Sequence, residues 1–194
     1  MTDLDPGRLV TVVRRLILRE FTHDSCIAST LAVVEVARYF GVKARPQPTT
    51  IRAYTARAWQ LGDDLAGKAP AAWPEGAYSV GIDGKAPSKP GRWNGHLVAV
   101  TATHLLDASL DQLARPQHGL TVRATAFEFP AHGWRDGALI GWENSRGTVI
   151  VYERTRDGDW RRSPNWNASL PTIRRVVGAA IRELREPVEA EVEP

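Results

Sequence analysis

Cys26 is the single cysteine of the chain, and its place in the sequence favours a reactive thiol. It opens an apolar run, 26–40, whose hydrophobic residues recur at the three- and four-residue spacing of a buried helix face. Asp24 or Ser25 can cap the start of this helix, and Gly41 supplies the left-handed residue that commonly follows a helix end. The unpaired N–H groups of a first helical turn stabilise a thiolate and can hold a developing oxyanion. Cys26 is therefore a candidate nucleophile, and the alternative is a small cysteine buried in the core.

A cysteine nucleophile needs a base, and the base needs a third group that orients it. His96 opens the best strand pattern of the sequence, 96–101, and Asp107 closes the next apolar run, 104–107. If a two-residue turn joins these runs as an antiparallel hairpin, Asp107 pairs with Val98 and becomes a diagonal neighbour of His96. The spacing thus predicts a Cys26–His96–Asp107 relay.

Other arrangements of the same residue types compete with this relay. His104 and Asp111 are alternatives to His96 and Asp107, although His104 falls near the expected turn and Asp111 near a helix start. A zinc site of scattered histidines and a carboxylate is a further alternative. Its candidate ligands do not have the spacing of a helical metal motif, so we expect neither a metal nor another cofactor; they are His23, His96, His104 and Asp107.

Two residues just before His96 are candidates for binding substrate. Trp93 stands beside a Gly- and Pro-rich stretch, 83–91, and an indole there can face a ligand. Asn94 can donate a hydrogen bond near the site, and its alternative role is that of a turn residue.

The remaining patterns predict the elements that would position this chemistry. Residues 6–21 form an amphipathic helix whose arginines, including Arg14, are expected on a solvated face. The segment 42–54 contains two prolines and predicts an extended, edge-like strand. The other expected elements are a short helix at 55–61, strands at 78–82 and 120–129, a hairpin of 139–143 with 148–153, a loop at 164–167 and a helix at 171–184. This order indicates a single α+β domain over 1–185, followed by an acidic disordered tail, 186–194.

Composition narrows the classes of partner. The chain has 194 residues, of which 43% are hydrophobic and 24% charged, with a net charge of +3. The basic residues are scattered, so nucleic acid is not an expected partner. We also expect no membrane association, because no apolar stretch is long enough for a span. The N-terminus lacks a signal-peptide layout, and a lone thiol suits a reducing compartment, so the expected location is cytoplasmic.

The sequence resembles the transglutaminase-like branch of the papain-like cysteine enzymes. The resemblance rests on Cys26 at a helix start, Gly-His-Leu-Val-Ala-Val at 95–100, Leu-Leu-Asp-Ala-Ser at 105–109, and the helix end at 39–45. It implies a papain-like fold in which Cys26 is the nucleophile, His96 the base and Asp107 the orienting carboxylate. The implied activity is acyl transfer, most simply hydrolysis of a peptide or other small amide. Transfer to an amine and a catalytically silent scaffold of the same fold remain alternatives, and the oligomeric state stays open.

Overall fold

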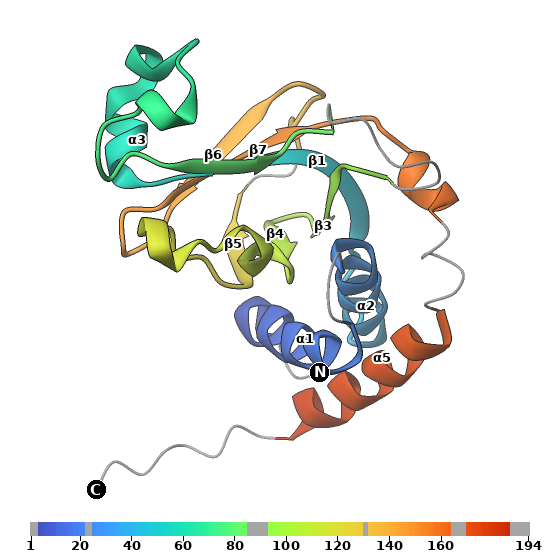
Figure 1. Cartoon of the computed structure of the whole chain (residues 1–194). Helices are drawn as coiled ribbons and strands as arrows, with labels where there is room; N and C mark the ends of the chain where they lie inside the picture. Colours follow the sequence, from blue (N-terminus) through green and yellow to red (C-terminus); the bar gives the residue numbers. More distant parts are fainter. Residues whose placement is uncertain (1–3, 22–24, 85–92, 130–131, 164–169, 187–194) are drawn as a thin grey trace, which may run out of the picture.

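The computed structural model describes residues 4–21, 25–84, 93–129, 132–163 and 170–186. Within these residues the chain is an α+β protein, with a layer of helices packed against a curled antiparallel sheet (Figure 1). The helices are α1 (Pro6–Glu20), α2 (Cys26–Tyr39), α3 (Ala56–Leu61) and α5 (Leu170–Arg185). The strands are β1 (Arg45–Tyr54), β2 (Ser79–Ile82), β3 (His96–Val100), β4 (His104–Asp107), β5 (Thr125–Glu128), β6 (Leu139–Glu143) and β7 (Val149–Arg154). None of the described helices is both long and apolar enough to cross a membrane.

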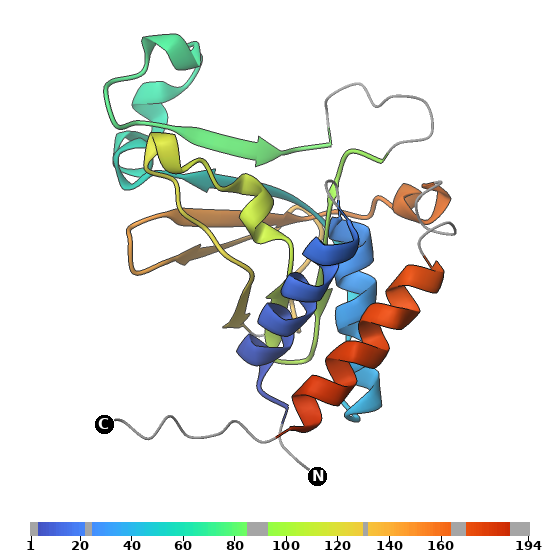
Figure 2. The ribbon, with the colours of Figure 1, turned by 60° about the horizontal axis from the view of Figure 1, so that its bottom comes forward.

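Helix α2 is the centre of the helical layer. Figures 1 and 2 show it between α1 and α5 on one side of the sheet. Its residues are apolar on almost every side, which is typical of a helix that is buried all round. Gly41 follows the helix end with a φ of 80°, as the sequence predicts, because glycine adopts the left-handed conformation without a steric penalty.

Strand β1 lies in the middle of the sheet, so its prediction as an edge-like strand is wrong. Its first half, 45–49, pairs with β3, and its second half pairs with β2 on that side and with β7 on the other. Pro46 and Pro48 lie in the first half, where the described residues give β1 a strand neighbour on one side only. A proline lacks the N–H that a second neighbour would need, so two prolines are tolerated at this position.

The hairpin of β3 and β4 has the predicted register. Ala99 pairs with Leu106 and Val100 with Leu105, which leaves a turn of two residues, 102–103. Ala-Thr is an unusual pair for such a turn. The Thr101 hydroxyl closes it by accepting hydrogen bonds from the backbone N–H groups of Thr103 and His104, at 3.2 and 2.9 Å.

The two faces of β3 contribute to two different cores. Leu97 and Ala99 belong to the core between the sheet and the helices, which also contains Cys26. Val98 and Val100 belong to a second core inside the curl of the sheet. Because side chains alternate along a strand, His96 faces the same side as Val98. His96 therefore lies on the inner face of the sheet, whereas Cys26 belongs to the layer of helices.

The other predicted elements are present with shifted ends. The short helix α3 begins after Thr55, whose hydroxyl accepts from the Ala58 N–H as a helix cap. The strand expected at 120–129 is confined to β5, and the β6–β7 hairpin and α5 are confirmed. Most of the loop predicted at 83–91, the loop predicted at 164–167 and the tail from residue 187 lie outside the described residues.

Candidate active site

Cys26 is the first residue of α2 and is buried, with 9% of its surface exposed. It therefore has the predicted helix-start position, where the first backbone N–H groups have no partner within the helix. Ser25 is the N-cap residue by position, but its side chain makes no capping hydrogen bond, so its predicted capping role is wrong. Its Oγ instead accepts hydrogen bonds from Arg14 Nη1 at 2.8 Å and from Gln112 Nε2 at 3.3 Å. Asp24, the other predicted cap, lies outside the described residues.

Arg14 is buried, so the prediction that it lies on a solvated face is wrong. Its Nε lies 2.8 Å from Asp111 Oδ1, and this ion pair offsets the cost of removing the guanidinium from water. Asp111 belongs to a short 3-10 helix (Leu110–Leu113) just after β4. Arg14 thus ties α1 to the residue before Cys26 and to the segment that follows Asp107.

His96 is completely buried at the start of β3. Its Nε2 lies 2.7 Å from Asp107 Oδ2, so the predicted diagonal contact across the hairpin is confirmed. The other ring nitrogen, Nδ1, makes no hydrogen bond of normal geometry among the described residues. Since Nε2 is occupied by Asp107, Nδ1 is the nitrogen left for Cys26, whose side chain interacts with this ring.

The charge of Asp107 sets the protonation of His96. Burial alone lowers the pKa of the imidazole, but the charge and hydrogen bond of Asp107, with smaller contributions from Cys26, raise it from 6.5 to about 10. The ring is therefore positively charged at neutral pH. A positive ring beside a sulfur favours the thiolate form of that sulfur.

Asp107 is also completely buried, and donors surround its carboxylate. Oδ1 accepts from the backbone N–H and the hydroxyl of Ser109, at 2.9 and 3.1 Å. Oδ2 accepts from the hydroxyl of Tyr152 at 2.9 Å, in addition to its contact with His96. Burial raises the pKa of Asp107, but His96 and these hydrogen bonds outweigh it and lower the pKa overall. The carboxylate is thus held ionised and in a fixed orientation.

Tyr152 and Ser109 are functional candidates that the sequence reasoning missed. Burial and the charge of Asp107 raise the pKa of Tyr152 well above 10, so its hydroxyl stays protonated and donates. Ser109 had a local signal, because Asp-x-Ser is a pattern in which an aspartate side chain caps the backbone two residues later. Tyr152 had only its position in a predicted strand, which does not indicate a partner forty-five residues away.

The two predicted substrate-binding residues immediately precede β3. The indole N–H of Trp93 donates to Asp157 Oδ2, which fixes the ring. The ring lies directly against Gly95, where any Cβ would overlap with it. Trp93 is half-buried and packs against the core that contains Cys26. Asn94 lies between Trp93 and Gly95 and is also partly exposed. Both residues are therefore near the site, and their contact with a substrate remains a prediction.

The competing arrangements place their residues elsewhere. His104 begins β4 at the turn end of the hairpin, opposite the end that holds His96 and Asp107, and its Nδ1 lies 2.9 Å from Thr103 Oγ1. Asp111 is paired with Arg14. In the part of the chain that the structure describes, no group of three or more His, Cys, Asp or Glu side chains is placed to hold a metal ion. His23, one of the candidate ligands, lies outside that part.

Comparison with known proteins identifies a fold rather than a family. No protein-family model matches the chain, and no curated protein matches it. A solved structure described as "The crystal structure of genomics APC5867" superposes with a TM-score of 0.52 at 15% sequence identity. The superposition covers 94% of this chain and 80% of that chain. The two proteins therefore share an α+β fold, and this likeness carries no information about activity.

Proposed function

We propose that this protein is a cysteine-dependent acyl-transfer enzyme that hydrolyses a peptide or other amide bond. The observation that supports the proposal is the buried 2.7 Å contact between His96 and Asp107, with the Cys26 side chain beside the same imidazole. A buried ion pair on two strands is weak evidence of a purely structural role, because apolar residues of similar size often stabilise a core as well or better. The arrangement is the one that a nucleophile, a base and an orienting carboxylate require. We further propose that the fold is papain-like, of the transglutaminase-like kind.

Each residue has a role in the proposed reaction. Cys26 Sγ, held as the thiolate beside the charged His96 ring, attacks the carbonyl carbon of the amide. The oxyanion that forms accepts a hydrogen bond from a backbone N–H of the first turn of α2. The carbon–nitrogen bond then breaks, His96 gives the proton to the leaving amine, and the acyl group stays on Sγ as a thioester.

Hydrolysis of the thioester completes the cycle. His96 takes a proton from water, the resulting hydroxide attacks the thioester carbon, and the carbon–sulfur bond breaks. The products are a carboxylic acid and the Cys26 thiolate beside the protonated His96 ring, which is the state in which the cycle began. Asp107 keeps the ring in one orientation and remains ionised throughout, since its carboxylate is held by Ser109 and Tyr152 as well as by His96. No cofactor enters this scheme. A free thiol of this kind suits the reducing cytoplasm, which is the location that we propose.

The first test uses Cys26 as its own probe. Because the chain has one cysteine, a single iodoacetamide adduct in the intact mass reports Cys26 alone. At pH 7.5, His96→Ala should slow alkylation by about tenfold or more, since the positive ring that favours the thiolate is gone. His104→Ala is the matched control and should leave the rate unchanged. If His104→Ala slows alkylation while His96→Ala does not, the assignment of the base is wrong.

The second test asks for the reaction itself. The protein is incubated with a panel of short peptides and aryl amides, and the intact mass is searched for an acyl adduct that is lost in Cys26→Ala. A released carboxylic acid identifies hydrolysis, whereas formation of a hydroxamate only after addition of hydroxylamine identifies transfer to an amine. A protein that forms no adduct with any member of the panel, and whose alkylation is insensitive to His96→Ala, is the catalytically silent scaffold.

A further inference from the structure

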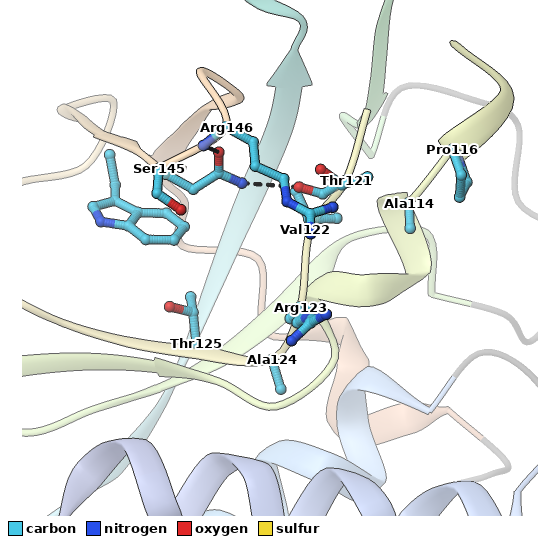
Figure 3. A pocket seen from close by; sticks show the side chains of 11 residues that line it. Ala114, Pro116, Thr121, Val122, Arg123, Ala124, Thr125, Ser145 and Arg146 are labelled. Carbon is cyan, nitrogen blue, oxygen red and sulfur yellow. Dashed lines mark hydrogen bonds between the residues drawn. The ribbon is translucent and has the colours of Figure 1, made fainter. Parts of the chain in front are cut away.

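A cavity of about 440 Å³ lies apart from the candidate active site, at the place where the curled sheet fails to close. One wall is the extended stretch 121–125 that leads into β5, and the other is the end of β6 with the turn after it (Figure 3). Strands β5 and β6 are the two ends of the sheet order and are not hydrogen-bonded to one another. Cys26 and His96 do not line this cavity.

Specific contacts hold the two walls in place. Asn144 Nδ2 donates to the Thr121 carbonyl at 2.8 Å, which links the turn after β6 to the opposite wall. Asn144 Oδ1 accepts from the backbone N–H groups of Arg146 and Thr148, at 2.9 and 3.0 Å, so the turn is fixed as well. Trp142 lines the cavity and stacks on Phe127 of β5, with ring planes 2° apart and centroids separated by 6.0 Å. The cavity is thus preformed, as ligand sites usually are.

The charge of the cavity is entirely positive. Figure 3 shows Arg146 reaching it from the turn after β6 and Arg123 reaching it from the opposite wall. Neither guanidinium forms an ion pair with any described residue, and no Asp or Glu is among the described residues that line the cavity. Elsewhere in the structure, Arg14 and Arg154 are paired with carboxylates. Two unpaired guanidinium groups on facing walls are the usual means of recognising a carboxylate or a phosphate.

We propose that this cavity binds a small organic anion, whose carboxylate or phosphate group is held by Arg123 and Arg146. The volume of the cavity favours an organic ligand rather than an inorganic ion, because about 440 Å³ is the size of cavity that small-molecule ligands occupy. The exposed side of the Trp142 ring and the side chain of Val122 give the rest of the ligand an apolar and flat surface. The hydroxyl of Ser145 is a further donor at the rim.

The test is a calorimetric titration of the whole protein with phenyl phosphate. Phenyl phosphate combines the anion with a flat ring, benzoate replaces the phosphate by a carboxylate, and phenol keeps the ring without the charge. We expect phenyl phosphate or benzoate to bind with a stoichiometry of one, and phenol not to bind. The stronger of the two anions identifies the preferred group.

Arginine variants then assign the site. Arg123→Gln and Arg146→Gln should each weaken binding by about tenfold, which is the usual effect of losing a hydrogen bond to a charged group. Arg174→Gln, on the exposed face of α5, removes the same charge at a distance and should leave the affinity unchanged. Equal binding of phenol and phenyl phosphate would overturn the proposal, as would full affinity in the Arg123→Gln/Arg146→Gln protein.

An NMR spectrum of the backbone amides of the wild-type protein tests the same site without any substitution. Saturation with the anion should shift the backbone resonances of residues 121–125 and 142–146 and leave those of α5 in place. Because the anion is held by charge, raising NaCl should weaken its binding. Shifts confined to other parts of the chain, or an absence of binding by both anions, would show that this cavity is not an anion site.

Discussion

The buried pair of His96 and Asp107 makes a prediction about the stability of the protein in alkali. In the folded chain the pKa of His96 is about 10, whereas an unfolded histidine titrates near 6.5. The stabilisation from the charged ring is therefore fully present below pH 6.5 and is lost as the pH rises towards 10. On the acid side, the lowered pKa of Asp107 gives a stabilisation that is present above the ordinary value of 3.8 and is lost as the pH falls through the lower, folded value.

The size of the alkaline effect follows from proton counting. Between pH 7 and pH 9 the folded ring keeps a proton that the unfolded ring has released, so the free energy of unfolding falls by about 1.4 kcal/mol per pH unit. Over these two units the loss is about 3 kcal/mol. Both proteins compared below carry Cys26→Ala, which removes the smaller contribution of Cys26 to the raised pKa of His96 and leaves the larger contribution of Asp107.

The assay compares two proteins by urea denaturation at closely spaced pH values. One carries Cys26→Ala and the other carries Cys26→Ala with Asp107→Asn. In the second protein no charge balances the burial of the ring, so the ring is neutral at pH 7 and the slope between pH 7 and pH 9 disappears. Other titrating groups contribute equally to both proteins and cancel in the difference.

The comparison can refute the buried ion pair. If the free energy of unfolding of the Cys26→Ala protein shows the same dependence on pH as that of the double variant, His96 is not held charged by Asp107. Should the double variant be too unstable to measure, Cys26→Ala with His96→Gln replaces it, because glutamine does not titrate and must also remove the slope.

Three further substitutions test single contacts. Tyr152→Phe removes one donor from the Asp107 carboxylate and should lower the free energy of unfolding by about 1.5–3 kcal/mol in urea denaturation; no loss would mean that the hydroxyl does not hold the carboxylate. Arg14→Met leaves Asp111 unpaired and removes one of the two donors to Ser25, the residue before Cys26, so it should destabilise the protein by about 3 kcal/mol and slow alkylation of Cys26. Asp111→Leu added to it should recover part of the stability but not the alkylation rate, and equal recovery of both would mean that the contact of Arg14 with Ser25 does not position Cys26. Gly178→Ala lies within α5, where the new Cβ meets only the flexible end of Arg182 at 3.8 Å, and should raise the free energy of unfolding by about 0.5–1 kcal/mol; a lower thermal midpoint would show that this helix face is more tightly packed than the structure indicates.

The contact between His96 and Asp107 was predictable because it depends on local rules. A two-residue turn fixes the register of a hairpin, and the register fixes which side chains are diagonal neighbours. The burial of α2 was predictable for a similar reason, since its residues are apolar on almost every side. Both inferences concern residues that are close in the chain.

The partners that complete the site are distant in the chain, and no local pattern indicates them. In the sequence, nothing distinguishes Arg14 from the other arginines of an amphipathic helix, because its partner Asp111 lies ninety-seven residues later. The proline-bearing segment that became β1 was expected at an edge, because the rule on prolines does not say how far a neighbouring strand extends. These features follow from the packing of layers rather than from spacing along the sequence.

The division of the two cores has a consequence for how the candidate site can be disturbed. The sheet fixes three of the site residues to one another, namely His96, Asp107 and Tyr152. Cys26, in contrast, belongs to a helix of the other layer. A small shift of α2 along the sheet would therefore separate sulfur from imidazole and leave the histidine–aspartate pair intact. The reactivity of the thiol thus measures the alignment of two packed layers. A substitution far from Cys26, in the face where α1 and α5 hold α2, can silence the site without touching any of its residues.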